Sequence, residues 1–181
     1  MSSEELHELH EHAEHAKHNP SLAPVSLTMA ILAVLVAIVS LLGHRAATEA
    51  VLNQSKASDQ WAYFQAKNIR GHEDKLFANL TAIVPASNTE ALAKVREEYL
   101  AEAEKYKDDQ KEIESEARKL EQEVALEQRK ADRFDLGEVF LEIALVISSI
   151  TLLSGKRMFW RLGLLMGTIG VILAGTVFLV R

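Results

Sequence analysis

The chain has 181 residues, contains no cysteine and carries a formal net charge of −6. The absence of cysteine excludes disulfides, thiolate metal clusters and thiol catalysis. The mixed signs of its charges leave no basic surface for nucleic acid. Hydrophobic residues make up 48% of the sequence and gather in three long runs, which indicates a membrane protein.

Residues 1–24 form an acidic tail that carries a cluster of histidines and ends in Pro20 and Pro24. Five of the seven histidines in the chain lie here: His7, His10, His12, His15 and His18. In a helix, histidine and glutamate three and four residues apart share a face, which suits Zn²⁺, Ni²⁺ or Cu²⁺. The tail is either a site for a divalent transition metal, with a pH response from its imidazoles, or a solvated segment. We expect no other cofactor.

The first apolar run, residues 25–43, predicts transmembrane helix 1. About 20 helical residues cross the roughly 30 Å hydrocarbon core. The acidic residues before this run and its length argue against a cleavable signal peptide. Small residues let membrane helices approach closely, and five of them share one face of the run: Ser26, Ala30, Ala33, Ala37 and Ser40.

The polar stretch 44–135 predicts a soluble helical hairpin made of helices 46–84 and 88–135. Pro85 ends the first helix, and Ser87 with Glu90 has the form of a capping box for the second. Neither helix contains a breaker where it meets an apolar run, so we expect each to continue into its neighbouring span. A 3-4 repeat predicts a coiled-coil seam at Val51, Ser58, Trp61, Gln65, Ile69, His72, Leu76 and Ile83 in the first helix, and at Ala103, Tyr106, Gln110, Ile113, Ala117, Leu120, Val124, Glu127, Ala131 and Phe134 in the second.

Residues 49–70 contain the blocks Ser58-Asp59-Gln60-Trp61 and Tyr63-Phe64-Gln65-Ala66-Lys67. With the His/Glu-rich tail, the first span ending at Gly43-His44 and the two closing apolar runs, they resemble an uncharacterised bacterial membrane-protein family, a domain of unknown function. The resemblance covers nearly the whole chain. It implies an architecture of three spans and supplies no activity, substrate or catalytic residue.

Within the same blocks, the polar residues allow two interpretations. They form either a polar site or, as we favour, a packed seam with a hydrogen-bonded layer, because their spacing is helical. The residues concerned are Asp59, Trp61, Gln65, Lys67 and Arg70.

The remaining runs, residues 136–155 and 158–180, predict transmembrane helices 2 and 3. Small residues on one strip of the third helix predict helix packing: Gly163, Gly167, Gly170 and Ala174. Carboxylates inside a span are costly and face a partner or water. An intramembrane charge cluster, either a packing clamp or a site that binds or conducts cations, is therefore predicted at His44, Arg45, Glu138 and Glu142.

Together these features predict an all-α membrane protein with three transmembrane helices and a long antiparallel helical hairpin between spans 1 and 2. The first interpretation of its function is a non-enzymatic homo-oligomer that presents the hairpin as a structural or interaction module, to further copies or to another protein. The alternative is an ion- or metal-handling membrane protein, a small channel or a metal- or pH-responsive regulator. The basic residues that flank the spans favour an inner-membrane protein with a cytoplasmic hairpin.

Overall fold

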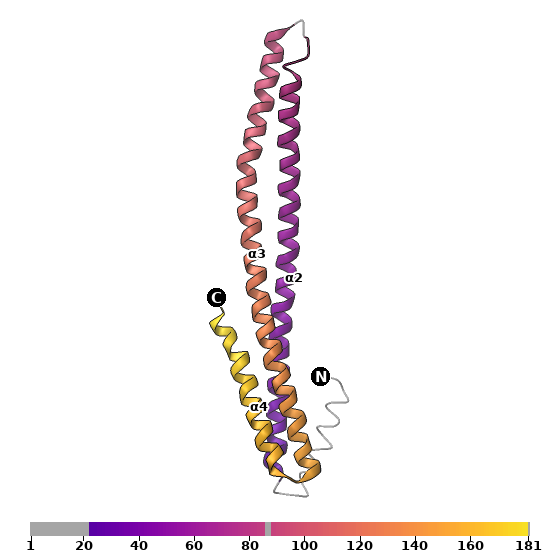
Figure 1. The fold of residues 1–181 in the computed structure, drawn as a ribbon, viewed down its shortest axis with the longest axis vertical. Helices are drawn as coiled ribbons and strands as arrows, with labels where there is room; N and C mark the ends of the chain where they lie inside the picture. Colours follow the sequence, from indigo (N-terminus) through magenta and orange to yellow (C-terminus); the bar gives the residue numbers. More distant parts are fainter. Residues whose placement is uncertain (1–21, 86–87, 181) are drawn as a thin grey trace. The chain divides into compact units, whose positions relative to one another are not determined.

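The computed structural model describes residues 22–85 and 88–180, and no strand occurs within these ranges. Three of the helices are long and apolar enough to cross a membrane, so the all-helical fold and the three apolar helices expected from the sequence are confirmed. The elements are α2 (Ala23–Leu80), α3 (Thr89–Ser154), α4 (Arg157–Gly175) and the 3-10 helix η1 (Thr176–Leu179) (Figure 1). The histidine tail lies outside the described residues.

The helices continue where the sequence contains no breaker and end at turn-forming residues. Helix α2 contains 58 residues and tolerates Pro24 because that proline lies in its first turn. It ends at Leu80, four residues before the expected end at Val84, and turns follow before Pro85.

Helix α3 contains 66 residues and begins at Thr89. Its cap is Asn88, because the backbone N–H of Ala91 donates to Asn88 Oδ1 at 3.0 Å. Asparagine is among the preferred N-cap residues. The capping residue proposed from the sequence, Ser87, lies outside the described residues.

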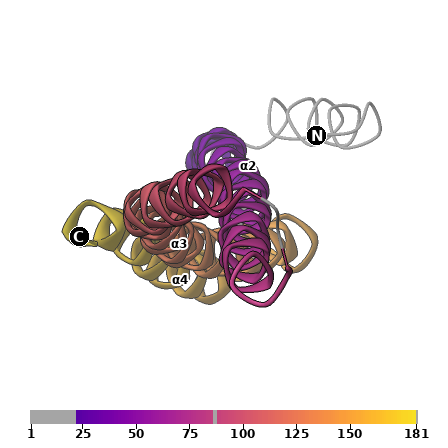
Figure 2. The same ribbon diagram turned by 90° about the horizontal axis from the view of Figure 1, so that it is seen from above.

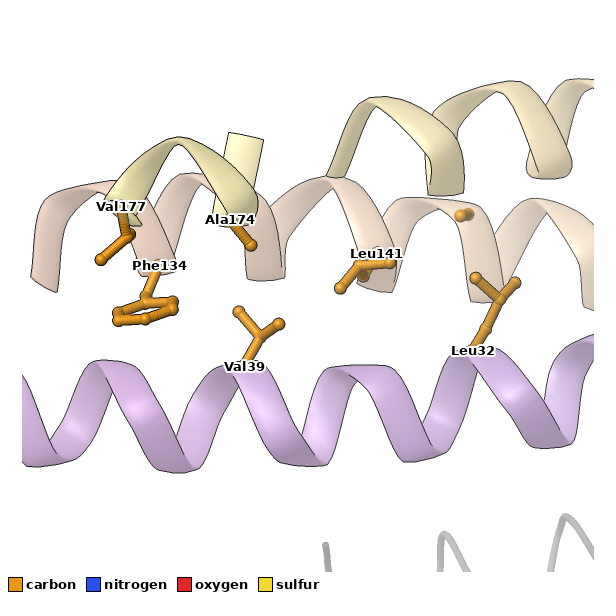
Figure 3. Packing of buried hydrophobic residues seen from close by; sticks show 7 residues of the cluster. Leu32, Val39, Phe134, Leu141, Ala174 and Val177 are labelled. Atoms are coloured by element: carbon orange, nitrogen blue, oxygen red, sulfur yellow. The ribbon is translucent and has the colours of Figure 1, made fainter. Parts of the chain in front are cut away.

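The contacts divide the chain into two compact units, which we describe separately. The apolar unit comprises residues 22–49 and 126–180 of the described chain, and the polar unit comprises residues 50–125. In the apolar unit α4 lies alongside the C-terminal part of α3 (Figures 1 and 2). The buried core of this unit consists of Leu32, Val39, Phe134, Leu141, Ala144, Ala174 and Val177 (Figure 3).

The buried residues of α4 are Gly163, Gly167, Gly170 and Ala174. A Cβ atom built on Gly170 would lie 2.8 Å from the carbonyl oxygen of Gly137, and one built on Gly137 would lie 2.9 Å from Ala174 Cβ. The two backbones therefore approach closely, and only small residues permit this distance between helices.

The small-residue strip expected on the first span is only partly buried. Ala33 is buried, Ser26 and Ser40 are half-buried, and Ala30 and Ala37 are exposed. Larger apolar side chains have the greater tendency to be buried, and in this copy the buried positions of the first span also include Val25, Met29, Leu32 and Val39.

In the polar unit, residues 50–80 of α2 contact residues 89–125 of α3. Side-chain contacts join Trp61 to Glu121, Lys67 to Asp109, and Phe77 to Tyr99. Most buried and half-buried residues of α2 along this contact follow a 3-4 repeat, which we call the inner seam: Ala50, Asn53, Ala57, Gln60, Phe64, Lys67, Gly71, Asp74 and Ala78. The half-buried residues Trp61 and Asn68 flank it.

The inner seam differs from the seam expected on α2 by about one residue. Of the expected positions only Trp61 is half-buried; the others, including Ile69 and Leu76, are exposed. Alanine and glycine let the two segments approach, whereas the larger side chains lie on the outside. On α3 the expected positions Ala103, Ile113 and Ala117 are buried.

Candidate interaction surface

Lys67 is the centre of a polar layer in the inner seam. Its Nζ donates to Asp109 Oδ2 at 2.9 Å, and its side chain is 16% exposed. The rings of Tyr63 and Tyr106 lie 5.5 and 4.8 Å from the same nitrogen, within cation–π range. The hydrogen bond to Asp109 raises the pKa of Lys67 above its ordinary value of 10.5. The ammonium group therefore stays charged near neutral pH and joins the two segments.

Trp61 forms a second contact across the same seam. Its Nε1 donates to Glu121 Oε1 at 2.8 Å, and the guanidinium carbon of Arg118 lies 5.8 Å from its ring. The ring of Phe64 meets it edge-on at 5.5 Å. Trp61 and Lys67 thus lie in a packed, hydrogen-bonded seam. The other polar residues of the motif, Asp59, Gln65 and Arg70, are exposed and are not brought into this layer.

Asp74 occupies the inner seam two turns after Lys67, and the sequence analysis missed it. Its Oδ2 atom is buried and has no hydrogen-bond partner among the described residues. Burial raises the pKa of this carboxyl above 3.8, the nearby charges of Glu102 and Glu73 raise it further, and Arg70 opposes them. The sequence did contain a signal for this position, because a carboxylate seven residues after Lys67 lies on the same face of a helix. It was overlooked because the larger apolar residues of α2 lie on the neighbouring face, where the seam was expected.

Substitution of Asp74 by asparagine is expected to raise the free energy of unfolding of the polar unit at pH 7. The gain should stay below about 1 kcal/mol, because solvent screens a partly exposed carboxylate. The pKa in the folded chain lies above the unfolded value of 3.8. The native protein therefore gains stability as pH falls through the folded pKa, and the advantage of the variant should vanish below pH 3.8.

Urea unfolding in mild detergent at pH 7 and again below pH 3.8 measures this effect. Glu98→Gln is the control, because Glu98 is an exposed carboxylate on α3. A destabilised Asp74→Asn protein at pH 7 would show that the carboxylate has a stabilising partner instead.

The predicted charge cluster falls within the apolar unit. His44, Arg45 and Glu142 are exposed, and Glu138 is half-buried. Within residues 22–85 and 88–180, no ion pair joins Arg45 to either glutamate. Glu142 thus lies exposed on the apolar part of α3, and the cluster stays a prediction.

Metal binding by the tail histidines is likewise outside the described residues. In the part of the chain that the structure describes, no group of three or more histidine, aspartate or glutamate side chains is arranged to hold a metal ion.

The polar unit exposes large apolar side chains despite its high charge. On α2 they include Val51, Ile69 and Leu76, which are 69%, 58% and 58% exposed. On α3 they include Val95 and Leu100. A large exposed apolar patch marks an interaction surface more often than an isolated residue does.

Two open grooves border this unit. One, of about 490 Å³, is lined by Thr81, Ala82, Thr89, Leu92, Ala93, Arg96, Glu97 and Leu100. The other, of about 380 Å³, is lined by Lys56, Asp59, Gln60, Tyr63, Glu116 and Leu120.

These features define an all-helical protein with three helices suited to crossing a membrane and a polar unit with exposed apolar side chains. The chain belongs to the family described as Domain of unknown function (DUF4337), whose profile matches residues 21–180. The resemblance to an uncharacterised family is therefore confirmed. Comparison with curated proteins and with solved structures finds no match.

Proposed function

We propose that this protein is a non-enzymatic, homo-oligomeric membrane protein whose three spans hold an antiparallel helical hairpin outside the bilayer as a structural or interaction module. The observation that carries the proposal is the polar unit, which is paired internally through Lys67 and Trp61 yet leaves Ile69 and Leu76 exposed. Apolar side chains that recur along the exposed face of a segment already paired on its other face support a further partner.

Antiparallel pairing is supported by the order of the contacts. Residue numbers fall along α3 as they rise along α2, from the Trp61–Glu121 pair through Lys67–Asp109 to Phe77–Tyr99. This is the order expected of two segments that run in opposite directions.

Membrane insertion is supported by the outer surface of the apolar unit. Large apolar side chains are exposed on α2, α3 and α4, among them Leu27, Val34, Val146, Leu153 and Ile172. Water would not tolerate such a surface, whereas the hydrocarbon core requires it. The basic residues beside the spans favour a cytoplasmic hairpin in an inner membrane.

The exposed carboxylate of Glu142 favours ion handling as the second candidate function. A charged group on an apolar span needs a partner or water, and a ring of such groups in an oligomer attracts cations. Cation flux into liposomes that is lost in Glu142→Gln but retained in Glu98→Gln would favour this candidate over a purely structural role.

We expect the purified protein to form an oligomer at micromolar concentration in mild detergent, as measured by light-scattering mass.

The position of each segment relative to the membrane can be tested with single cysteines, since the chain has none of its own. A cysteine at Ser87 should react with an impermeant thiol reagent in inverted vesicles, and one at Ser3 should react in intact cells.

The matched control is a cysteine at Ile38, which is 49% exposed on the first apolar run. It should stay unlabelled from both sides because lipid covers it. A monomeric mass would refute the oligomer, and labelling of Ile38→Cys at the rate of Ser87→Cys would refute the membrane span.

A further inference from the structure

A second heptad pattern runs along the outside of α2 in the polar unit. We call it the outer stripe; its members follow a 3-4 repeat at Val51, Ser55, Ser58, Ala62, Gln65, Ile69, His72, Leu76 and Asn79. Every one of these side chains is exposed. Four of them are apolar, Val51, Ala62, Ile69 and Leu76, and the last three lie one heptad apart, as core residues of a coiled coil do. The intramolecular contact with α3 uses the inner seam and leaves the outer stripe uncovered.

Charged residues occur in the inner seam of α2 and are absent from the exposed outer stripe, which is the reverse of what solvation favours. The outer stripe contains no lysine, arginine, aspartate or glutamate, whereas the inner seam contains Lys67 and Asp74. An exposed helix face in water is normally rich in charged residues. A face of nine consecutive heptad positions without charge therefore indicates that another helix covers it.

Counting by the same repeat toward the N-terminus leads into the first apolar run. There the positions are Leu27, Ala30, Val34, Ala37 and Leu41, and all five are exposed. Ala30 and Ala37 are one heptad apart, and small residues at such positions let membrane helices approach. The sequence thus repeats one uncovered pattern through both the apolar and the polar part of α2.

We infer that the outer stripe binds the outer stripe of a second copy of this chain, parallel and in register. This inference rests on the proposed function, because copies inserted the same way in one bilayer present α2 in the same direction. Parallel pairing stacks Ile69 on Ile69 and Leu76 on Leu76 of the two copies. The polar layers at Gln65 and His72 then fix the register, as polar core residues do in parallel coiled coils.

The residues that flank the outer stripe complement one another in this arrangement. Parallel pairing sets Gln54 beside Asp59 of the second copy and Asn68 beside Glu73 of the second copy, so that amides can donate to carboxylates. In one copy the Oδ1 atom of Asn68 accepts from Gln110 Nε2 at 3.5 Å, which leaves its amide N–H groups to donate. Antiparallel pairing centred on Ala66 would instead oppose Asp59 and Glu73, two like charges.

Disulfide cross-linking of the full chain in native membranes tests the inference. Ile69→Cys and Leu76→Cys should form dimers under mild oxidation, because facing core positions lie within disulfide reach. The matched controls are Lys56→Cys and Arg70→Cys, which are exposed on the same helix but off the outer stripe. We expect the stripe cysteines to cross-link at least about tenfold faster than the controls, since only facing positions meet the geometric requirement.

A second pair of variants measures assembly. Ile69→Glu combined with Leu76→Glu should lower the detergent mass while the helical circular dichroism signal stays unchanged, because both residues are exposed in one copy. Val95→Glu with Leu100→Glu, two exposed positions on α3, should leave the mass unchanged.

The outcomes separate this inference from the proposed function. An oligomeric protein whose stripe cysteines react no faster than the controls would overturn the inference and leave the proposed oligomer standing. A monomeric wild-type protein would overturn both. An unchanged mass for the Ile69→Glu, Leu76→Glu protein would also overturn the inference.

Discussion

Substitution of Gly170 by leucine is expected to give the largest loss of stability among single changes in the apolar unit. A Cβ atom at this position would lie 2.8 Å from the carbonyl oxygen of Gly137 and 3.1 Å from the backbone nitrogen of Leu141. Both are backbone atoms, so relief requires a shift of the whole of α4 away from α3. Overpacking by one methyl group costs about 1–3 kcal/mol, and the larger leucine side chain should exceed that range.

Titration with a denaturing detergent in mixed micelles measures the free energy of unfolding. Gly175→Leu is the matched control, because a Cβ atom there has no atom within 4 Å among the described residues. The two glycines lie in the same helix, so the loss of helix-breaking glycine is common to both variants. Equal stability of the two variants would show that α3 and α4 are not packed this closely.

Substitution of Ala117 by leucine is expected to have the largest effect in the polar unit. Ala117 is 0% exposed in the contact between α2 and α3, and the added volume should cost about 1–3 kcal/mol of unfolding free energy. Alanine and leucine have similar helix propensities, so α3 itself should remain intact. Glu121, one turn later, accepts from Trp61, so the indole should respond when the two segments separate.

Urea unfolding in detergent, followed by the fluorescence of Trp61 in a Trp160→Phe background, measures this loss. Ala101→Leu is the control, because Ala101 is exposed on the same helix. If both alanine variants unfold at the same urea concentration, the described seam does not stabilise the polar unit.

Periodicity predicted the helices because their signals are local. Long apolar runs, the absence of proline near residues 44–47, and Pro85 together indicate where α2 and α3 continue and end. The seam on α3 was also predictable, because its buried residues include Ile113 and Ala117, which are apolar and therefore contribute to the sequence pattern.

The seam on α2 was not predictable in the same way. Its buried positions are small residues such as Ala57 and Gly71, which contribute little to an apolar pattern. Ile69 and Leu76 dominate that pattern and lie on the outside. The error of one residue arose because apolar periodicity marks the face with the larger side chains, whereas the buried face of α2 is built mainly of small ones.

The polar contacts depend on register, which no local pattern contains. Lys67 and Asp109 are 42 residues apart, and their meeting requires the turn near Pro85 to set the alignment of two long helices. Several acidic residues of α3 were equally plausible partners, among them Asp108 and Glu112. The cluster predicted for Arg45 with Glu138 and Glu142 depends on register in the same way, and it stays a prediction.

The short connection between α3 and α4 determines an order of assembly. It consists of Gly155, which has a φ of +67° that favours glycine, and Lys156. The contacts between α3 and α4 therefore close small loops, whereas the hydrogen bond from Trp160 to Thr28 spans 132 residues. Loop-closure entropy makes the short-range pair the faster one to form. During synthesis residues 23–49 of α2 emerge first, but their packing sites in the apolar unit are made last. We therefore expect this part of α2 to dock onto a preformed pair of α3 and α4.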